Sequence, residues 1–209
     1  MKKAIVSAAL IVFSLIFMTS CANMTSSEAE EILRPLIESS HELNVIFFGE
    51  GLPTMTDEEM ENDFTPEGIM RAQATNASYV PVTPESKYQT IQSLKEATEK
   101  IFTPAYAQVI YSLTMEGISS EFDESTGIES TILYARYIED YGVLTASRNP
   151  DKFYTERTYD FTTLTVQKSS ASHISATIMT KSEADESPIS VRIQAIKTQT
   201  GWRLDSPTY

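Results

Sequence analysis

The stretch 189–205, ISVRIQAIKTQTGWRLD, decides the fold of this chain. Apolar residues occupy every second position from Ile189 to Ala195, and polar residues occupy the positions between them. Such alternation is typical of a β-strand with one buried and one solvated face, as found in antiparallel sheets. Thr200-Gly201 then predicts a tight turn into a last strand over 202–205. The C-terminal part of the chain is therefore expected to form an antiparallel hairpin.

Upstream of this hairpin, alternation continues through the second half of the chain. It predicts further strands over 131–139, 142–146, 158–168 and 173–181. The first half has helical spacing instead, with apolar residues recurring from Ile32 to Phe47, and two shorter helices are predicted after residue 86, the second beginning at Thr103-Pro104. The proline in YVPV, residues 79–82, predicts an edge strand. Helices followed by antiparallel strands predict an α+β domain, in which N-terminal helices pack on a curved antiparallel sheet.

The ends of the first helix and the segment that follows it can also be predicted. Ser27 and Glu30 have capping-box spacing at its start, Gly49 marks its end, and Pro35 should either kink it or mark its first turn. Between residues 50 and 78 the periodicity is lost and acidic residues are frequent, so we predict a long, partly ordered connection. Five apolar residues within it indicate that part of it packs back onto the domain: Met55, Met60, Phe64, Ile69 and Met70.

Residues 1–20 have the layout of a secretory signal peptide, in which Lys2 and Lys3 precede an uncharged, largely apolar run. The run is about 15 residues long, whereas a helix that crosses a bilayer needs roughly 20. It ends in Met18-Thr19-Ser20-Cys21, which resembles the lipobox of bacterial lipoproteins, although that family most often has leucine at the position of Met18. The resemblance implies that Cys21 is acylated and becomes the first residue of the mature chain. An ordinary secretory signal and an uncleaved anchor are the alternatives.

Charge and cysteine content limit the function classes. Cys21 is the only cysteine of the 209 residues, so a chain lipidated there has no thiol for a disulfide, a metal site or a nucleophile. The formal net charge is −13, and removal of Lys2 and Lys3 with the signal peptide makes it −15. Nucleic acids and anionic lipid surfaces attract clustered Lys and Arg, so neither is an expected partner, whereas a basic protein is compatible with the charge. A negative surface that only keeps an exported protein soluble is the alternative.

These features divide the chain into three parts. Residues 1–20 are the predicted signal peptide, residues 21–78 contain the lipidated N-terminus, a helix and an acidic linker, and residues 79–209 form the α+β globular domain. The predicted location is the extracytoplasmic side of the cell membrane, to which lipid on Cys21 attaches the protein. We expect a monomer.

Two resemblances bear on the globular part. Helices followed by a meander that ends in Gly201-Trp202-Arg203-Leu204 resemble the cystatin-like cone of nuclear-transport-factor-two-like domains. The strings YVPV, SLKEATEKIFTPAYAQVIY and ARYIEDYGVL, which lie between Tyr79 and Leu144, are similar to the secreted and lipid-anchored inhibitors of bacterial cell-wall DL-endopeptidases. The second resemblance implies an extracytoplasmic protein that covers the substrate groove of wall hydrolases. Such an inhibitor needs a rigid contact surface and a charge opposite to that of the enzyme.

The predicted contacts of such a partner lie in the polar loop 119–126 and on the tyrosines near it. They are Glu121, Asp123, Glu124, Tyr134 and Tyr137. An acidic loop that is only solvated is the alternative interpretation of the three carboxylates.

A catalytic function has little support in the sequence. His41 and His173 are the only histidines, both are expected on solvated faces, and an Asp160–His173 pair on neighbouring strands would be a workable proton-transfer couple. The chain contains no HExxH, no GxSxG and no glycine-rich phosphate loop. We therefore predict no enzyme, no catalytic residue, no metal and no cofactor. The remaining alternative is a module for a small ligand or wall fragment, lined by aromatic residues of the strands: Tyr134, Tyr137, Tyr141, Tyr154, Tyr159 and Trp202.

Overall fold

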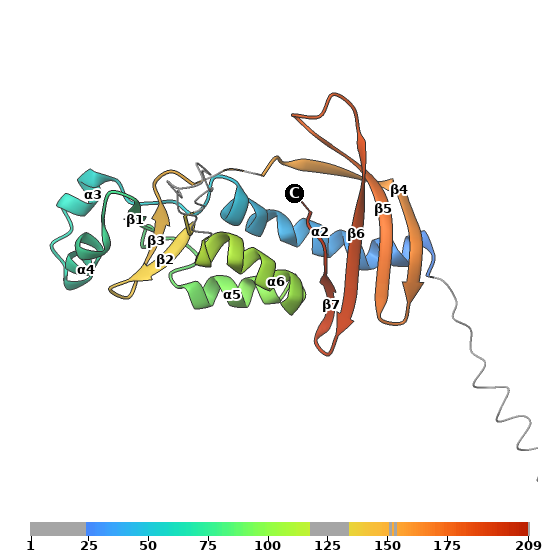
Figure 1. The fold of residues 1–209 in the computed structure, drawn as a ribbon, viewed down its shortest axis with the longest axis horizontal. Helices are drawn as coiled ribbons and strands as arrows, with labels where there is room; N and C mark the ends of the chain where they lie inside the picture. Colours follow the sequence, from blue (N-terminus) through green and yellow to red (C-terminus); the bar gives the residue numbers. More distant parts are fainter. Residues whose placement is uncertain (1–23, 118–133, 151, 153, 209) are drawn as a thin grey trace, which may run out of the picture.

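The computed structural model describes residues 24–117, 134–150, 152 and 154–208 (Figure 1). Its helices are α2 (Ser26–Phe48), α3 (Asp57–Glu61), α4 (Pro66–Ala74), α5 (Ile91–Glu99) and α6 (Pro104–Tyr111), which continues into the π-helical turn η1 (Ser112–Glu116). The strands are β1 (Tyr79–Pro81), β2 (Tyr137–Asp140), β3 (Val143–Ser147), β4 (Arg157–Ser170), β5 (His173–Ser182), β6 (Ile189–Thr198) and β7 (Gly201–Leu204). The predicted α+β class is confirmed.

The strands form two antiparallel sheets instead of the single curved sheet that was predicted. The small sheet has the order β1-β3-β2 and the large sheet has the order β4-β5-β6-β7. Between β3 and β4 the chain leaves one sheet and crosses to the other (Figure 1). Pro150 lies in this crossing, and a proline cannot donate to a strand ladder. The cystatin-like cone is therefore not confirmed.

Helix α2 begins and ends at hydrogen-bonded caps. Its N-cap is Thr25, two residues before the predicted cap, and Thr25 forms a capping box with Glu28: the Thr25 hydroxyl accepts from the Glu28 amide at 3.3 Å, and the Glu28 carboxylate accepts from the Thr25 amide at 2.8 Å. The helix continues through Pro35, which does not mark its first turn, and it ends at Gly49 as predicted.

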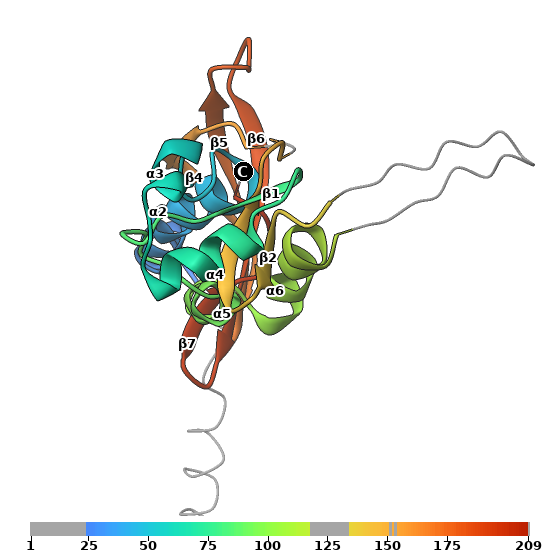
Figure 2. The same cartoon turned by 90° about the vertical axis from the view of Figure 1, so that its left-hand side faces the viewer.

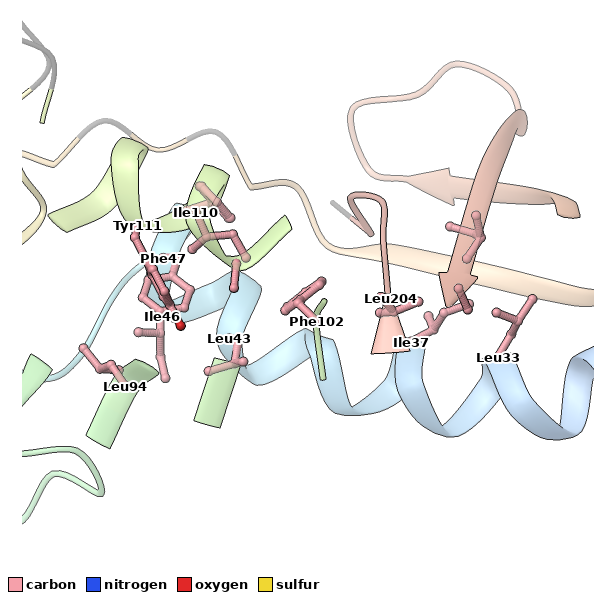
Figure 3. Packing of buried hydrophobic residues seen from close by; sticks show 14 of the residues in the cluster. Leu33, Ile37, Leu43, Ile46, Phe47, Leu94, Phe102, Ile110, Tyr111 and Leu204 are labelled. Atoms are coloured by element: carbon pink, nitrogen blue, oxygen red, sulfur yellow. The ribbon is translucent and has the colours of Figure 1, made fainter. Parts of the chain in front are cut away.

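Helix α2 is also the element around which both sheets are arranged. It runs along the long axis of the molecule (Figure 1), and its buried residues belong to one hydrophobic core. In Figure 3, Leu33 and Ile37 point toward the large sheet, whereas Leu43 and Phe47 lie among residues of α5 and α6. The helix that the sequence assigned to a part preceding the globular domain is thus a component of the domain's core.

The segment predicted to be a partly ordered connection contains two short helices. Thr56 caps α3 in a capping box with Glu59, and Thr65 caps α4, with Pro66 in the first turn. These local signals specify helix starts, and the sequence prediction of a partly ordered connection did not include the two helices because it gave more weight to the acidic composition.

The C-terminal strands agree closely with their prediction. Ile193 and Ala195 are fully buried, and Gly201, the first residue of β7 after the turn, has φ 118°, a conformation that glycine adopts readily. Ile189, at the start of β6, is exposed. Among the strands that the structure describes, β1 pairs with β3 and lies at one edge of the small sheet, as its proline indicated.

Candidate interaction surface at the α3–α4 tip

Four of the predicted site residues lie outside the residues that the structure describes: Cys21, Glu121, Asp123 and Glu124. Within the described ranges, no helix combines the length and the apolar character needed to cross a bilayer. In the same ranges, the His, Cys, Asp and Glu side chains form no group of three or more that could hold a metal ion.

The two remaining predicted site residues, both tyrosines, have opposite environments. Tyr134, just before β2, is 65% exposed, whereas Tyr137 is 0% exposed. The Tyr137 hydroxyl donates to the Ile46 carbonyl at 2.9 Å and accepts from the Leu52 amide at 2.9 Å. Burial raises the pKa of Tyr137. The expected contact role of Tyr137 is thereby corrected, because its side chain joins β2 to the end of α2 and does not reach the surface.

The most unusual surface of the described chain is formed by residues 57–74, which comprise α3, α4 and the turn between them and are called the tip below. Three of its large apolar side chains are exposed: Phe64 at 85%, Ile69 at 56% and Met70 at 41%. Of the apolar residues that indicated packing of part of this segment onto the domain, these three do not pack back, whereas Met55 is buried. An open pocket of about 430 Å³ lies beside Phe64 and Ile69. Contiguous exposed apolar surface is typical of an interaction site.

Asp63 fixes the turn from which Phe64 projects. One carboxylate oxygen accepts from the Thr65 amide at 3.2 Å and from its hydroxyl at 2.5 Å, and the other accepts from Arg71 at 2.7 and 3.2 Å. The bonds from Thr65 and the Arg71 guanidinium lower the pKa of Asp63 to about 2. Gly68 permits the close approach of α4, because an added Cβ would lie 2.2 Å from the Asp63 carbonyl oxygen. The apolar surface is therefore presented by a tightly bonded turn.

The tip carries many more acidic than basic residues. Residues 57–74 contain Arg71 as their only Lys or Arg, against six acidic residues: Asp57, Glu58, Glu59, Glu61, Asp63 and Glu67. Exposed apolar side chains and acidic residues thus occur within one short segment, and protein–protein interfaces commonly combine an apolar core with a polar rim.

The tip is attached to the small sheet and lies at one end of the molecule. Just before it, the Met55 amide donates to the Pro81 carbonyl at 2.9 Å, and Arg148 lies 3.4 Å from Asp57. Figure 1 shows α3 and α4 at the opposite end of the long axis from the start of α2, and Figure 2 shows them nearest the viewer. The β2–β3 turn, which contains the exposed Tyr141, lies at the same end.

The acid–base couple considered from the sequence is not formed. Asp160 pairs with Met179 in the sheet, and His173 pairs with Ile196 and Ser170. Met179 is six positions further along β5 than His173, which corresponds to about 20 Å. His41 is exposed, as expected, but its Nδ1 lies 2.6 Å from the Tyr154 hydroxyl. This contact joins α2 to the chain before β4, and no sequence spacing pointed to it.

Comparisons of the chain with protein-family models, with curated proteins and with solved structures gave no match.

Proposed function

We propose that this chain is a lipid-anchored, extracytoplasmic protein-binding module that contacts a basic protein through its tip. The observation that supports this function best is the coincidence, within residues 57–74, of three exposed large apolar side chains with six acidic residues. Apolar side chains in such a patch provide most of the affinity of an interface, and the surrounding charges select the partner and accelerate encounter.

The sign of the charge favours a basic partner. Asp63 is neutralised by Arg71 and Asp57 lies near Arg148, but Glu58, Glu61 and Glu67 are exposed carboxylates. A partner with Lys or Arg around an apolar recess would satisfy these groups, whereas an anionic partner would be repelled.

The lipobox resemblance adds an orientation to this proposal. Cys21 precedes Met24, the first described residue, by three positions, and the start of α2, two residues after Met24, lies at the far end of the molecule from the tip (Figure 1). The 23 residues of α2 extend about 34 Å at a rise of about 1.5 Å per residue. In a chain anchored by lipid on Cys21, this length would hold the tip away from the bilayer, where a wall-bound protein could reach it.

The partner class we propose is a cell-wall DL-endopeptidase, which the tip would help to inhibit. This choice rests on the resemblance of residues 79–144 to inhibitors of those enzymes. It also provides an activity that can be measured, the digestion of peptidoglycan.

The test uses residues 21–209 with Cys21→Ser, purified without lipid, and wall endopeptidases from the same organism. We expect the protein to slow peptidoglycan digestion, and we expect Phe64→Ala to weaken this inhibition about 30-fold, since a central aromatic residue of an interface commonly contributes about 2 kcal/mol. Ile189→Ala, which truncates an exposed apolar residue of the large sheet outside the tip, is the control and should leave inhibition unchanged. Undiminished digestion at excess protein would reject the inhibitor proposal, and equal inhibition by Phe64→Ala would reject the tip as its contact surface.

A further inference from the structure

A groove lies between α2 and the chain that enters β4, on a part of the molecule distinct from the tip. Its volume is about 330 Å³, at the lower end of the range for small-molecule sites. We call it the α2–β4 groove. Its walls include Arg34, Glu38 and His41 of α2 on one side and Tyr154, Tyr159 and Phe161 on the other.

The aromatic wall is held in place by hydrogen bonds. The Tyr154 amide donates to the Phe48 carbonyl at 2.9 Å, and the Tyr154 hydroxyl lies 2.6 Å from His41 Nδ1. The Tyr159 hydroxyl donates to the Thr208 carbonyl at 2.9 Å, and burial raises the pKa of Tyr159 to about 12, so this phenol is neutral at physiological pH. Rings that are fixed before a ligand arrives lose little conformational entropy on binding.

The polar wall offers both hydrogen-bond donors and hydrogen-bond acceptors. The Arg34 guanidinium stacks 3.9 Å from the centroid of the Phe161 ring. Glu38 lies 3.9 Å from Arg34, and Glu156 at the rim lies 3.9 Å from His41 Nε2. Both distances are too long for hydrogen bonds, and both glutamate side chains are exposed. These carboxylate oxygens of Glu38 and Glu156 are therefore accessible to a ligand hydroxyl.

The charges around the groove narrow the class of ligand. Two arginines, Arg34 and Arg157, and two carboxylates, Glu38 and Glu156, line it. Each arginine also has a carboxylate partner outside the groove, Arg34 in Glu30 and Arg157 in Asp185 at 2.8 Å. A strongly anionic ligand would therefore be repelled by Glu38 and Glu156, and a strongly cationic ligand would lie beside two guanidinium groups. A neutral ligand with several hydroxyl groups can use the donors and the acceptors together, and its apolar ring face can pack on the aromatic wall.

We propose that the α2–β4 groove binds a neutral saccharide of one or two rings. The sugar's apolar face packs on Tyr154 or Tyr159, and its hydroxyl groups bond with Arg34 and the two carboxylates. This site is independent of the protein contact proposed for the tip, since the two share no residue.

The test is calorimetric titration of residues 21–209 carrying Cys21→Ser with two neutral disaccharides, N,N′-diacetylchitobiose and cellobiose. At least one should bind, and its amide shift perturbations in ¹⁵N NMR spectra should cluster in residues 34–44 and 154–161. Tyr154→Ala should reduce the affinity about tenfold or more through loss of the ring. Tyr141→Ala, an exposed tyrosine at the β2–β3 turn, is the matched control and should bind as the unsubstituted chain does.

Three outcomes would overturn the proposal: binding of neither disaccharide, shift perturbations confined to other parts of the protein, or unchanged affinity in Tyr154→Ala. The NMR mapping on the unsubstituted chain keeps the test decisive if Tyr154→Ala does not fold. Glucuronate and glucosamine, which carry opposite charges, test the charge argument, because tighter binding of either than of both neutral sugars would contradict it.

Discussion

Tyr137→Phe offers the most direct test of how the small sheet is joined to α2. The substitution keeps the buried ring, including its edge contact with Phe47 at a centroid distance of 6.4 Å, and removes only the hydroxyl group. That hydroxyl donates to the Ile46 carbonyl in the last turn of α2 and accepts from the Leu52 amide beyond it. Both partners would lose a buried hydrogen bond without gaining access to water.

The expected cost follows from these two contacts. A buried hydrogen bond contributes about 1 kcal/mol net, and a buried polar group left without a partner costs about 1–3 kcal/mol. We therefore expect Tyr137→Phe to lower the free energy of unfolding by about 2–3 kcal/mol. For a domain of this size, each kcal/mol lowers the melting temperature by about 2–4 °C, so a decrease of about 5–10 °C is expected.

Urea unfolding followed by circular dichroism measures the effect, on residues 21–209 with Cys21→Ser. The matched control is Tyr134→Phe, which removes the same atom from an exposed tyrosine three residues earlier and should change stability by less than about 0.5 kcal/mol. If Tyr137→Phe were as mild as its control, the hydroxyl would not be contributing the interactions described, and the assignment of Tyr137 to the core junction would have to be abandoned.

Three further predictions concern the tip and the core. The pKa of Asp63 in the folded protein is about 2, below its ordinary value of 3.8. The contribution of this ionised carboxylate to stability is therefore complete above pH 3.8 and is lost as the pH falls toward 2. An NMR titration of the Asp63 carboxyl should give a midpoint near pH 2, and a midpoint near 3.8 would contradict the hydrogen bonds described for the turn. Gly68→Ala places a Cβ against the Asp63 carbonyl and should displace α4. In hydrogen-exchange measurements, amides of residues 57–74 should then exchange faster with solvent, while those of the large sheet remain protected. Unchanged amide exchange at the tip would exclude the close approach of Gly68 to Asp63. Leu33→Ala removes a fully buried side chain of α2 and should cost about 2–5 kcal/mol in urea unfolding, whereas a cost below about 1 kcal/mol would indicate that α2 is not part of the core.

Local patterns in the sequence predict the elements of this fold well. Alternation identified β4 to β7 within a few residues, and Thr103-Pro104 identified the start of α6 because both signals act over neighbouring positions. The division into two sheets depends on which strands pair across long distances, and alternation carries no information about pairing partners.

The candidate surface was only partly predictable for the same reason. Thr56 and Thr65 provide local cap signals that could have identified α3 and α4, and the acidic character of the segment was visible in the sequence. The exposure of Phe64 could not be predicted from the sequence, because the burial of a side chain depends on whether a distant element covers it. None of the described elements covers Phe64. The Tyr154–His41 contact joins positions 113 residues apart and has no local signal at all.

The bonding of α2 has a consequence for the order in which the chain folds. The carbonyls at its C-terminal end bond with residues far along the sequence: Gly49 with Arg136, Ile46 with Tyr137 and Phe48 with Tyr154. Its middle depends on still later residues, because Ser40 and Asn44 bond with Thr208. Helix α2 precedes all of these partners in the sequence, so the groups at its C-terminal end bond with residues 136–154 only after those are made, and Asn44 bonds with Thr208 later still. A growing chain therefore cannot complete this part of its core before residue 208 is available.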